Sequence, residues 1–216
     1  MSLVAVVDYG GSNLRSVAKA LEAVAGDRVA VRIVDDAAAL LGCDRVVFPG
    51  QGAIGDCMRG LTERGLISAI QECRRTRPFF GICLGLQSLM ETSDEDGGTP
   101  CLAAFAGNVR RFRANAGPGA DRTPRKIPHM GWNQVEWMKS HPVTRGVPSG
   151  TRFYFVHSYY VVPDDPSCVM GRTEYIDPFV SALGAGFVFA TQFHPEKSAA
   201  VGLQLLRNFS HWNGEV

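Results

Sequence analysis

Short β-branched runs alternate with amphipathic stretches through the first half of the chain. Apolar runs occupy 3–7, 29–34 and 45–48, and a stretch with helical spacing of its apolar residues occupies 13–25. Strands that alternate with helices pair in parallel, because each helix returns the chain across the sheet. The sequence therefore predicts an α/β fold with an open, mostly parallel twisted sheet and helices on both faces.

Polar residues and glycine mark the expected helix ends. Ser12 precedes the first helix as a capping residue, and Gly26 follows it. We expect a second helix over 58–75, whose basic end is a solvated face, and a shorter helical pattern over 84–91. Ser198 is placed to cap a last helix.

The second half changes from strand–helix alternation to strands separated by turn residues. This pattern predicts antiparallel hairpins and a mixed edge added to the parallel sheet. The segment Ala114–Pro124 is rich in glycine, proline and alanine and predicts a mobile surface insertion. Because too few strands lie on either side to close a separate core, we expect residues 1–216 to form a single domain. The expected strands are 109–112, 134–138, 153–162, 169–175, 179–183 and 187–192.

Charge and cysteine usage exclude several classes of function. The 22 Lys and Arg residues nearly balance 21 Asp and Glu, so no basic field favours nucleic acid or a membrane surface. The first apolar run is too short to span a bilayer and lacks a basic leader, which favours a cytoplasmic protein. Six unevenly spaced cysteines include no C-x-x-C pair. We therefore expect neither metal nor cofactor, and a small molecule or a protein as partner.

One cysteine differs from the others. The apolar run 79–82 breaks into the helical pattern at Gly81-Ile82-Cys83-Leu84-Gly85, which has the form G-x-C-x-G. This is the cysteine counterpart of a nucleophile elbow, where a sharp strand-to-helix turn exposes the nucleophile at a helix start that favours thiolate. The alternative is a buried cysteine in a tight turn. The strand before and the helix after favour Cys83 as a nucleophile.

A cysteine nucleophile needs a general base, and His194 is the best candidate. It follows the strand expected at 187–193, and the carboxyl ends of parallel strands border the binding crevice of an open sheet. Glu196 lies two residues on and would orient the imidazole. Taken alone, His194 could equally be a strand-end histidine and Glu196 a first-turn helix acid; together with the elbow, they predict a Cys-His-Glu triad.

A glycine-rich loop follows the third strand. Its Gly50, Gln51 and Gly52 let backbone N–H groups turn toward an oxygen, and the N–H of Leu84 would complete an oxyanion hole beside the elbow. The alternative is a tight turn. No Walker lysine or complete G-x-G-x-x-G accompanies these glycines, so a nucleotide site is not indicated.

Together these motifs resemble the class I glutamine amidotransferases. Within that family the chain is similar to the glutaminase subunits of imidazole glycerol phosphate synthases, and the P-H-M-G-W-N and F-V-H-S-Y segments carry the narrower resemblance. The resemblance covers nearly the whole chain. The segments that carry it are Asp8-Tyr9-Gly10 with Asn13-Leu14, Pro49 to Ala53, Gly81 to Gln87, Pro128 to Asn133, Tyr154 to Tyr159 and His194 to Ser198.

The resemblance implies hydrolysis of L-glutamine to glutamate and ammonia. Cys83 would form a glutamyl thioester, His194 would move the proton and Glu196 would orient His194. Ammonia would pass to a separate (β/α)8 cyclase subunit, in a heterodimer that makes imidazole glycerol phosphate and aminoimidazole carboxamide ribotide in histidine biosynthesis. The residues that would bind glutamine are Gln87, Glu95, His157, Ser158 and Tyr159; the alternative for Glu95 is a solvated acid.

The same resemblance implies that the cyclase docks over the mouth of the active site. Alternatives from the residues alone are a core position for Trp132 and an exposed charge for Lys197. One residue departs from the family, because Gln51 stands where a small apolar residue is usual. The residues expected near the partner are Asn13, His129, Met130, Trp132, Asn133, Tyr154 and Lys197.

Two other functions compete with this interpretation. A class I glutaminase that serves another synthase would share the triad but would not be expected to carry His129 to Asn133. A glutamine-binding regulatory module would have the fold with a broken triad. All three triad residues are present, which favours an enzyme.

Overall fold

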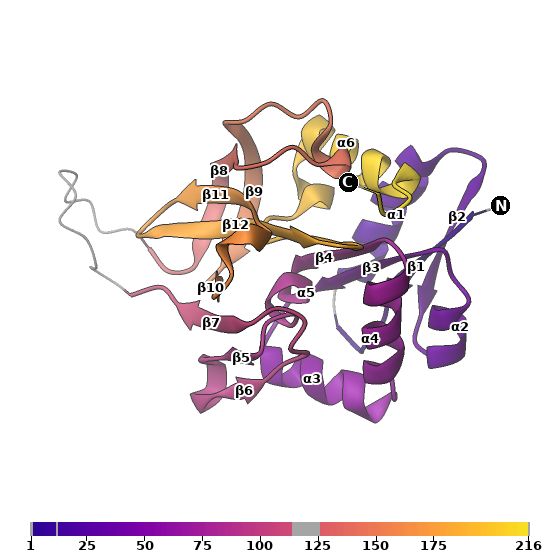
Figure 1. Ribbon diagram of the computed structural model, residues 1–216, viewed down its shortest axis with the longest axis horizontal. Coiled ribbons are helices and arrows are strands. Elements are labelled where there is room, and N and C mark those ends of the chain that lie inside the picture. Colours follow the sequence, from indigo (N-terminus) through magenta and orange to yellow (C-terminus); the bar gives the residue numbers. More distant parts are fainter. Residues whose placement is uncertain (1, 12, 114–125, 216) are drawn as a thin grey trace.

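The computed structural model describes residues 2–11, 13–113 and 126–215. Its centre is a parallel sheet, as predicted (Figure 1). In spatial order the strands are β2 (Val29–Val34), β1 (Ser2–Val7), β3 (Arg45–Gly50), β4 (Phe79–Cys83) and β13 (Val188–Thr191). Neighbouring strands in this group are all parallel.

The predicted mixed portion extends this sheet beyond β13. The first strand there, β12, is antiparallel to β13 and also pairs with β10 and with β11. From β10 the sheet continues through β7, β5 and β6, and from β11 it branches to β8 and β9. These strands are β5 (Thr92–Ser93), β6 (Thr99–Pro100), β7 (Gly107–Arg111), β8 (His129–Trp137), β9 (Thr151–His157), β10 (Tyr159–Pro163), β11 (Val169–Glu174) and β12 (Pro178–Ala185).

Helices cover both faces of the parallel sheet (Figure 1). On one face α1 (Leu14–Ala25) packs against α6 (Ala199–His211). The other face carries α2 (Ala37–Leu41), α3 (Ile54–Glu63) and α4 (Ile67–Thr76). Successive strand residues point to opposite faces, so Val4 and Val6 pack with the first helix pair, whereas Ala5 and Val7 pack with the second group. A doubly covered sheet explains why these strands are continuous apolar runs.

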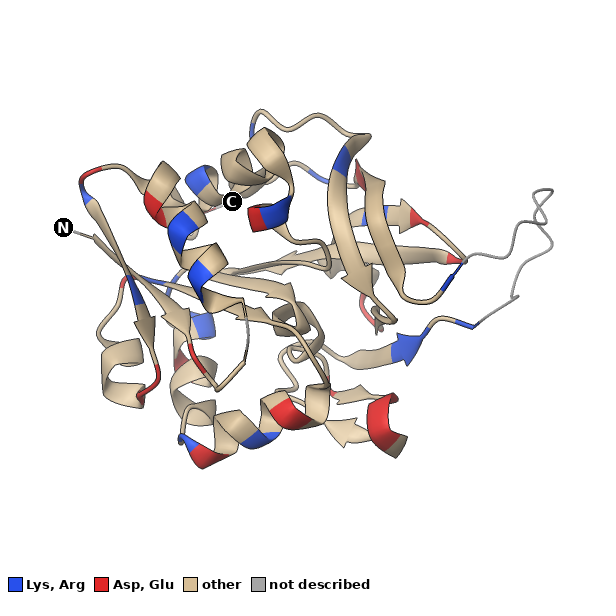
Figure 2. Ribbon diagram, turned by 180° about the vertical axis from the view of Figure 1, so that it is seen from behind, with Lys and Arg blue, Asp and Glu red and all other residues tan. Residues whose placement is uncertain are grey.

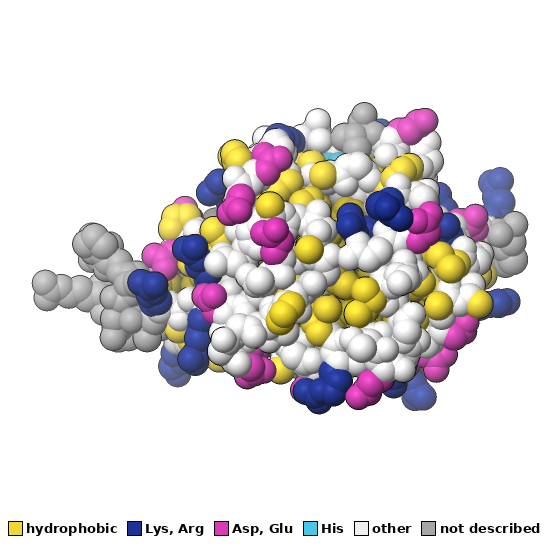
Figure 3. Space-filling model, turned by 60° about the horizontal axis from the view of Figure 1, so that its bottom comes forward, with side chains coloured by type: hydrophobic (Ala, Val, Ile, Leu, Met, Phe, Trp, Pro, Cys, Tyr) yellow, Lys and Arg dark blue, Asp and Glu magenta, His cyan; other side chains and the backbone are white. Residues whose placement is uncertain are grey.

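Charged residues lie mainly on helices and loops, and few lie on the central strands (Figure 2). Positive and negative side chains are interspersed on the face that Figure 3 shows, in keeping with a formal net charge of +1. Within the described residues, every helix falls short of the length and apolar character needed to cross a bilayer.

Several local predictions are wrong at their boundaries. The helix expected over 58–75 is two helices, because Gly65 adopts a left-handed φ of 64° between α3 and α4. The pattern over 84–91 forms only the short helix α5 (Leu84–Gln87). The strand expected over 153–162 divides at Ser158. The acidic segment 94–98, which carried no secondary-structure prediction from the sequence, forms a 3₁₀ turn, η1 (Glu95–Gly97).

The expected helix ends have different outcomes. Gly26 ends α1 with φ of 73°, as predicted. Ser12 and the segment Ala114–Pro124 lie outside the described residues. Ser198 stands at the start of α6 but does not cap it; its Oγ donates to the carbonyl oxygen of His194 (2.6 Å) and accepts from the N–H of Tyr154 (3.0 Å). The contact with Tyr154 on β9 has thus taken the place of the expected capping hydrogen bond to α6.

The turn from β4 into α5 packs directly on β3. A Cβ on Gly85 would lie 1.8 Å from the carbonyl oxygen of Phe48, and a Cβ on Gly81 would lie 2.9 Å from that of Gly85. Both contacts involve backbone, which cannot rotate away. Only glycine fits at both positions, because any larger side chain would clash with these backbone atoms.

We expect Gly85→Ala to lower the free energy of unfolding by at least about 3 kcal/mol, because β3 and α5 must separate. Gly55→Ala is the matched control, since a Cβ there meets only Asp96 Oδ2 at 3.5 Å; it should change stability by less than about 1 kcal/mol. Urea denaturation measures both. Equal stability of the two variants would contradict the close approach.

Candidate active site

Three parallel strands end side by side at one edge of the sheet. The register pairs Gly50 at the end of β3 with Cys83 at the end of β4, and Ile82 with Thr191 at the end of β13. The glycine-rich loop, the elbow cysteine and the segment that leads to His194 therefore leave the sheet together. The carboxyl edge of a parallel sheet is where binding crevices form.

Cys83 has a strained backbone, with φ of 53° and ψ of −102°. A non-glycine residue at positive φ costs on the order of 1–3 kcal/mol, which the packing of both glycines around it must sustain. The thiol is 6% exposed, and its Sγ lies 4.0 Å from the carbonyl oxygen of Val156. Strand, strained residue and helix have the order that the elbow pattern predicts.

His194 and Glu196 are joined to the first helix by a buried polar chain. His194 Nδ1 lies 2.9 Å from Glu196 Oε1, and the two side chains are 1% and 0% exposed. The same oxygen accepts a hydrogen bond from Asn13 Nδ2 at 2.6 Å. Among the described residues, His194 Nε2 has no hydrogen-bond partner. The carboxylate holds one ring nitrogen, which leaves the other available to Cys83 and to a substrate.

The surroundings of His194 and Glu196 favour the charged form of each side chain. Burial alone lowers the pKa of His194, but Cys83 and Glu196 outweigh it and raise that pKa to about 10. Burial likewise acts to raise the pKa of Glu196, whereas hydrogen bonds and the charge of His194 hold it below its ordinary value. An imidazolium between a carboxylate and a thiol is the arrangement that activates a cysteine nucleophile.

A cavity of about 360 Å³ opens above Cys83. It unites residues that are far apart in the sequence, including most of those expected to bind glutamine or form the oxyanion hole. His194, Glu196 and Gly50 lie outside its lining. The lining residues are Gln51, Gly52, Cys83, Leu84, Gln87, Glu95, Pro128, Tyr154, Val156, His157, Ser158, Tyr159 and Lys197.

Glu95 is held in place at this cavity. Its Oε2 accepts a hydrogen bond from the N–H of Ile54 at 2.8 Å, at the start of α3. Burial raises the pKa of Glu95 above its ordinary value; the hydrogen bond from Ile54 acts to lower this pKa, and the charges of Asp96 and Asp56 act to raise it. The residue is half-buried and lines the cavity, so it is not a fully solvated acid.

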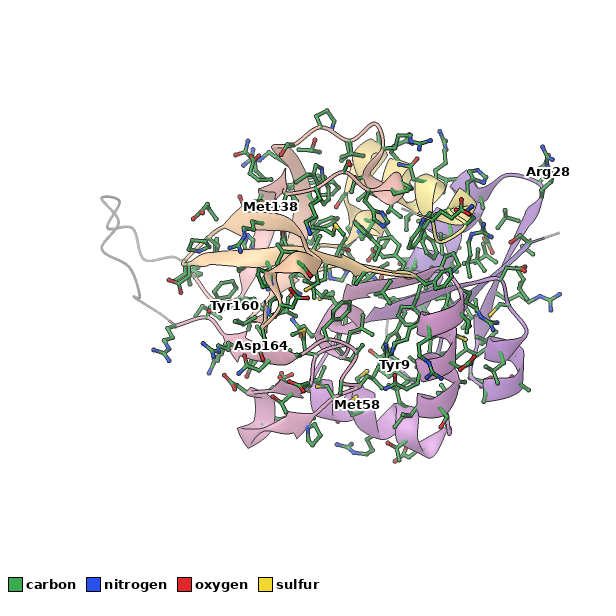
Figure 4. All side chains as sticks on the ribbon, in the orientation of Figure 1. Tyr9, Arg28, Met58, Met138, Tyr160 and Asp164 are labelled. Carbon is green, nitrogen blue, oxygen red and sulfur yellow. The ribbon has the colours of Figure 1, made fainter. Side chains whose placement is uncertain are left out.

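The side chain of Tyr9 packs against the glycine-rich loop at Gly50. The tyrosine lies on the side of the sheet that α3 and α4 cover (Figure 4). A Cβ on Gly50 would lie 2.5 Å from its hydroxyl oxygen and 2.9 Å from Leu84 Cβ. Gly52, two residues on, has φ of 102°. The loop combines a close approach with a left-handed residue, which is the reason for its two glycines.

Sequence analysis missed Gln192, which is fully buried beside Cys83. Its Nε2 lies 3.6 Å from Cys83 Sγ, and its Oε1 accepts a hydrogen bond from Gln87 Nε2 at 3.2 Å. The period-two spacing of Gln192 and His194 at a strand end could have indicated it, because such residues point to the same side.

The residues expected at a partner surface divide into two groups. On β8, Met130 and Trp132 are 62% and 46% exposed, so the surface interpretation of Trp132 is favoured over the core one. His129 is instead buried and stacks on Phe155 and Tyr175. Asn133 donates to the carbonyl oxygen of Glu174 (2.7 Å). Alternation along a strand explains the difference, since neighbouring residues face opposite sides.

Two of the other three expected surface residues, Tyr154 and Lys197, line the cavity. Tyr154 lines it and meets Trp132 edge to face, with ring centroids 6.3 Å apart. Lys197 is exposed and also lines the cavity. Asn13 instead donates a hydrogen bond from its side chain to Glu196.

The chain matches a known protein family along most of its length. The profile described as glutamine amidotransferase class-I matches residues 5–212. The chain belongs to the class-I glutamine amidotransferase family. This amidotransferase is therefore an enzyme, and its fold is that of the family.

Two curated relatives match this amidotransferase over its full length. The imidazole glycerol phosphate synthase subunit HisH of Nitrosococcus oceani is 52% identical over 214 residues, covering 99% of both chains. The subunit of the same name from Methylococcus capsulatus is 51% identical over 213 residues, covering 98% of this chain and 97% of the relative. Identity at this level places all three proteins in one family.

Solved structures with lower identity share the fold of this amidotransferase. PurLQS from Thermotoga maritima matches with a TM-score of 0.70 and 21% identity, covering 96% of this chain and 97% of that chain. The glutaminase domain of Trypanosoma brucei CTPS matches with a TM-score of 0.64 and 20% identity, covering 100% and 97%.

The raised pKa of His194 predicts a pH dependence of stability. The folded protein keeps the His194 proton up to about pH 10, whereas the unfolded chain releases it near the ordinary value of 6.5. Binding of this proton therefore adds to the free energy of unfolding. The added stability is complete below pH 6.5 and is lost as pH rises toward 10. Glu196→Gln removes one cause of the raised pKa of His194. The pH range over which the protein loses this stability therefore becomes shorter. We expect the urea midpoint of this variant to change less between pH 7 and 9.5 than that of the parent.

Glu72→Gln is the matched control, because Glu72 forms an exposed ion pair with Arg75 on α4, remote from His194. Its urea midpoint should follow the parent across the same pH range. A parallel pH dependence in Glu196→Gln and the parent would show that Glu196 does not hold the proton on His194.

Proposed function

We propose that this enzyme hydrolyses L-glutamine to glutamate and ammonia and delivers the ammonia to a (β/α)8 cyclase subunit. The full-length identity of 52% to an imidazole glycerol phosphate synthase subunit HisH carries the proposal. In that heterodimer the cyclase makes imidazole glycerol phosphate and aminoimidazole carboxamide ribotide in histidine biosynthesis. Two observations support the chemistry: Cys83 lines the cavity, and Cys83 and Glu196 together raise the pKa of the buried His194.

The proposed reaction is acyl transfer through a thioester. Cys83 Sγ attacks the side-chain carboxamide carbon of glutamine, and the resulting oxyanion is stabilised by backbone N–H groups around Gly50 to Gly52 and at Leu84. His194 gives its proton to the departing nitrogen, which leaves as ammonia. His194 then takes a proton from water, whose oxygen attacks the thioester carbon, and the Cys83 thiolate leaves as glutamate forms.

The cavity supports recognition of the whole glutamine molecule. Glu95 offers a carboxylate to the substrate α-ammonium group, and its attachment to the start of α3 keeps it fixed. Gln87, on α5, is buried beside the nucleophile. Residues 157–159 line another part of the wall, so an α-carboxylate there would meet the strand interruption at Ser158.

Ammonia must be passed on without protonation, because ammonium has no lone pair to donate. A partner seated over the cavity mouth would exclude water from the path. The exposed Met130 and Trp132 lie on the strand next to β9, whose Tyr154 reaches the cavity. We therefore propose this face, with Lys197, as the docking surface of the cyclase.

The structure also bears on the domain organisation and on the location of the protein. We propose that residues 1–216 act as one domain, since strands from both halves share the sheet. We also propose a cytoplasmic location, because all six cysteines, which lie in the described part of the chain, are free thiols.

Cys83→Ala should lower the rate of glutamate formation by at least about a thousandfold, because the covalent route requires the thiol. Glutamine binding should persist, since the cavity wall is otherwise intact, and isothermal titration calorimetry checks this. Cys101→Ala is the matched control and should keep the parent rate. Parent-like turnover in Cys83→Ala would refute the nucleophile.

Trp132→Ala should weaken association with the cyclase on the order of tenfold or more, because exposed aromatic anchors dominate interface energies. Surface plasmon resonance with the purified cyclase measures the Kd. Met138→Ala is the control, since Met138 is 52% exposed but follows the opposite end of β8 (Figure 4). Equal Kd values for the two variants would place the docking surface elsewhere.

A further inference from the structure

We propose that Gln192 is a catalytic residue that donates a side-chain hydrogen bond to Cys83 Sγ and stabilises the thiolate. The inference rests on the proposed glutaminase function and adds a group to its reacting centre. Gln192 Nε2 lies 3.6 Å from Sγ, a distance suited to an N–H donor and the large sulfur atom.

The backbone of Gln192 fixes where its side chain begins. The residue follows β13, and its N–H donates to the carbonyl oxygen of Ser181 on β12 at 2.9 Å. β13 is the direct parallel neighbour of β4, whose last residue is Cys83. Gln192 is fully buried, so water does not compete for its amide. The donor is preorganised by the sheet.

One backbone carbonyl determines which end of the Gln192 amide faces the sulfur. The carbonyl oxygen of Tyr159 can only accept, and Gln87 Nε2 lies 2.9 Å from it, so Gln87 presents its NH₂ group there. That same nitrogen lies 3.2 Å from the Gln192 amide and donates to its oxygen. The Gln192 NH₂ group is then the part that remains for Cys83.

A buried thiolate needs hydrogen-bond donors, since burial penalises the charged form. His194 supplies a charged donor, but its proton is used in the reaction. The Gln192 amide does not titrate, so it can hold the thiolate without giving up a proton. It would act twice: on the thiolate that attacks the carboxamide, and on the thiolate that leaves when water cleaves the thioester. Charge-assisted hydrogen bonds are stronger than neutral ones, so the contact is strongest at those two points.

Two variants separate this role from simple packing. Gln192→Met keeps the approximate volume and removes the donor. Gln192→Glu keeps the oxygen that accepts from Gln87 and places a second oxygen toward the sulfur. The readout is the pH dependence of Cys83 alkylation by iodoacetamide, followed on the Cys83 peptide by mass spectrometry.

We expect the midpoint of the alkylation profile to rise by about one pH unit in Gln192→Met, equivalent to a tenfold loss of thiolate, and further in Gln192→Glu. Glutamine turnover should fall about tenfold to a hundredfold in both. Gln71→Met is the matched control, because Gln71 donates to the carbonyl oxygen of Leu102, remote from Cys83. The midpoint of Cys83 alkylation in Gln71→Met should equal that of the parent.

Unchanged alkylation midpoints in folded Gln192→Met or Gln192→Glu would overturn the proposal, and a urea titration establishes folding. If Gln192→Met does not fold, the near-isosteric Gln192→Glu decides alone. The alkylation assay needs no turnover, so it is independent of the proposed function. A parent that forms no glutamate would refute glutaminase activity, while a shifted alkylation profile would still show contact between Gln192 and the thiol.

Discussion

The register of three parallel strands is the constraint on which the site depends. β3, β4 and β13 end within one residue of each other, so the glycine-rich loop, the elbow and the segment carrying His194 emerge at one edge. A shift of one residue in β4 would turn Cys83 to the other face of the sheet. The close contact of Gly85 with Phe48 opposes such a shift, because it sets how α5 lies on β3.

The second constraint is the burial of charge next to the nucleophile. His194 and Glu196 are almost fully buried, which is costly unless each finds a partner. Each does, since Glu196 Oε1 accepts from both Asn13 and His194. Asn13 itself adopts a left-handed φ of 74° at the start of α1. The residue that precedes the first helix thus binds Glu196.

The exposed strand β8 and the nucleophile share one hydrogen-bonded chain. Asn133 contacts His129, whose Nδ1 lies 3.0 Å from His157 Nε2, and His157 Nδ1 lies 2.7 Å from the carbonyl oxygen of Tyr159. That carbonyl oxygen accepts from Gln87, and Gln192 continues the chain to Cys83. Since a carbonyl only accepts, Nδ1 of His157 carries a proton and Nε2 accepts from His129. Burial and His129 lower the pKa of His157 to about 3, so this histidine stays neutral.

The sequence by itself determined the parallel sheet, the elbow at Cys83 and the candidates His194 and Glu196, because period, glycine placement and residue chemistry are local properties. It failed where distant segments decide the outcome. Ser198 looked like a helix cap but binds β9, and His129 looked like a surface residue but lies in an aromatic cluster. For Gln192 the only signal was its two-residue spacing from His194, which does not identify the thiol as its neighbour. Only the pairing of β13 with β4 brings Gln192 to the thiol. Strand neighbours are set by long-range packing free energy, which a local pattern does not contain.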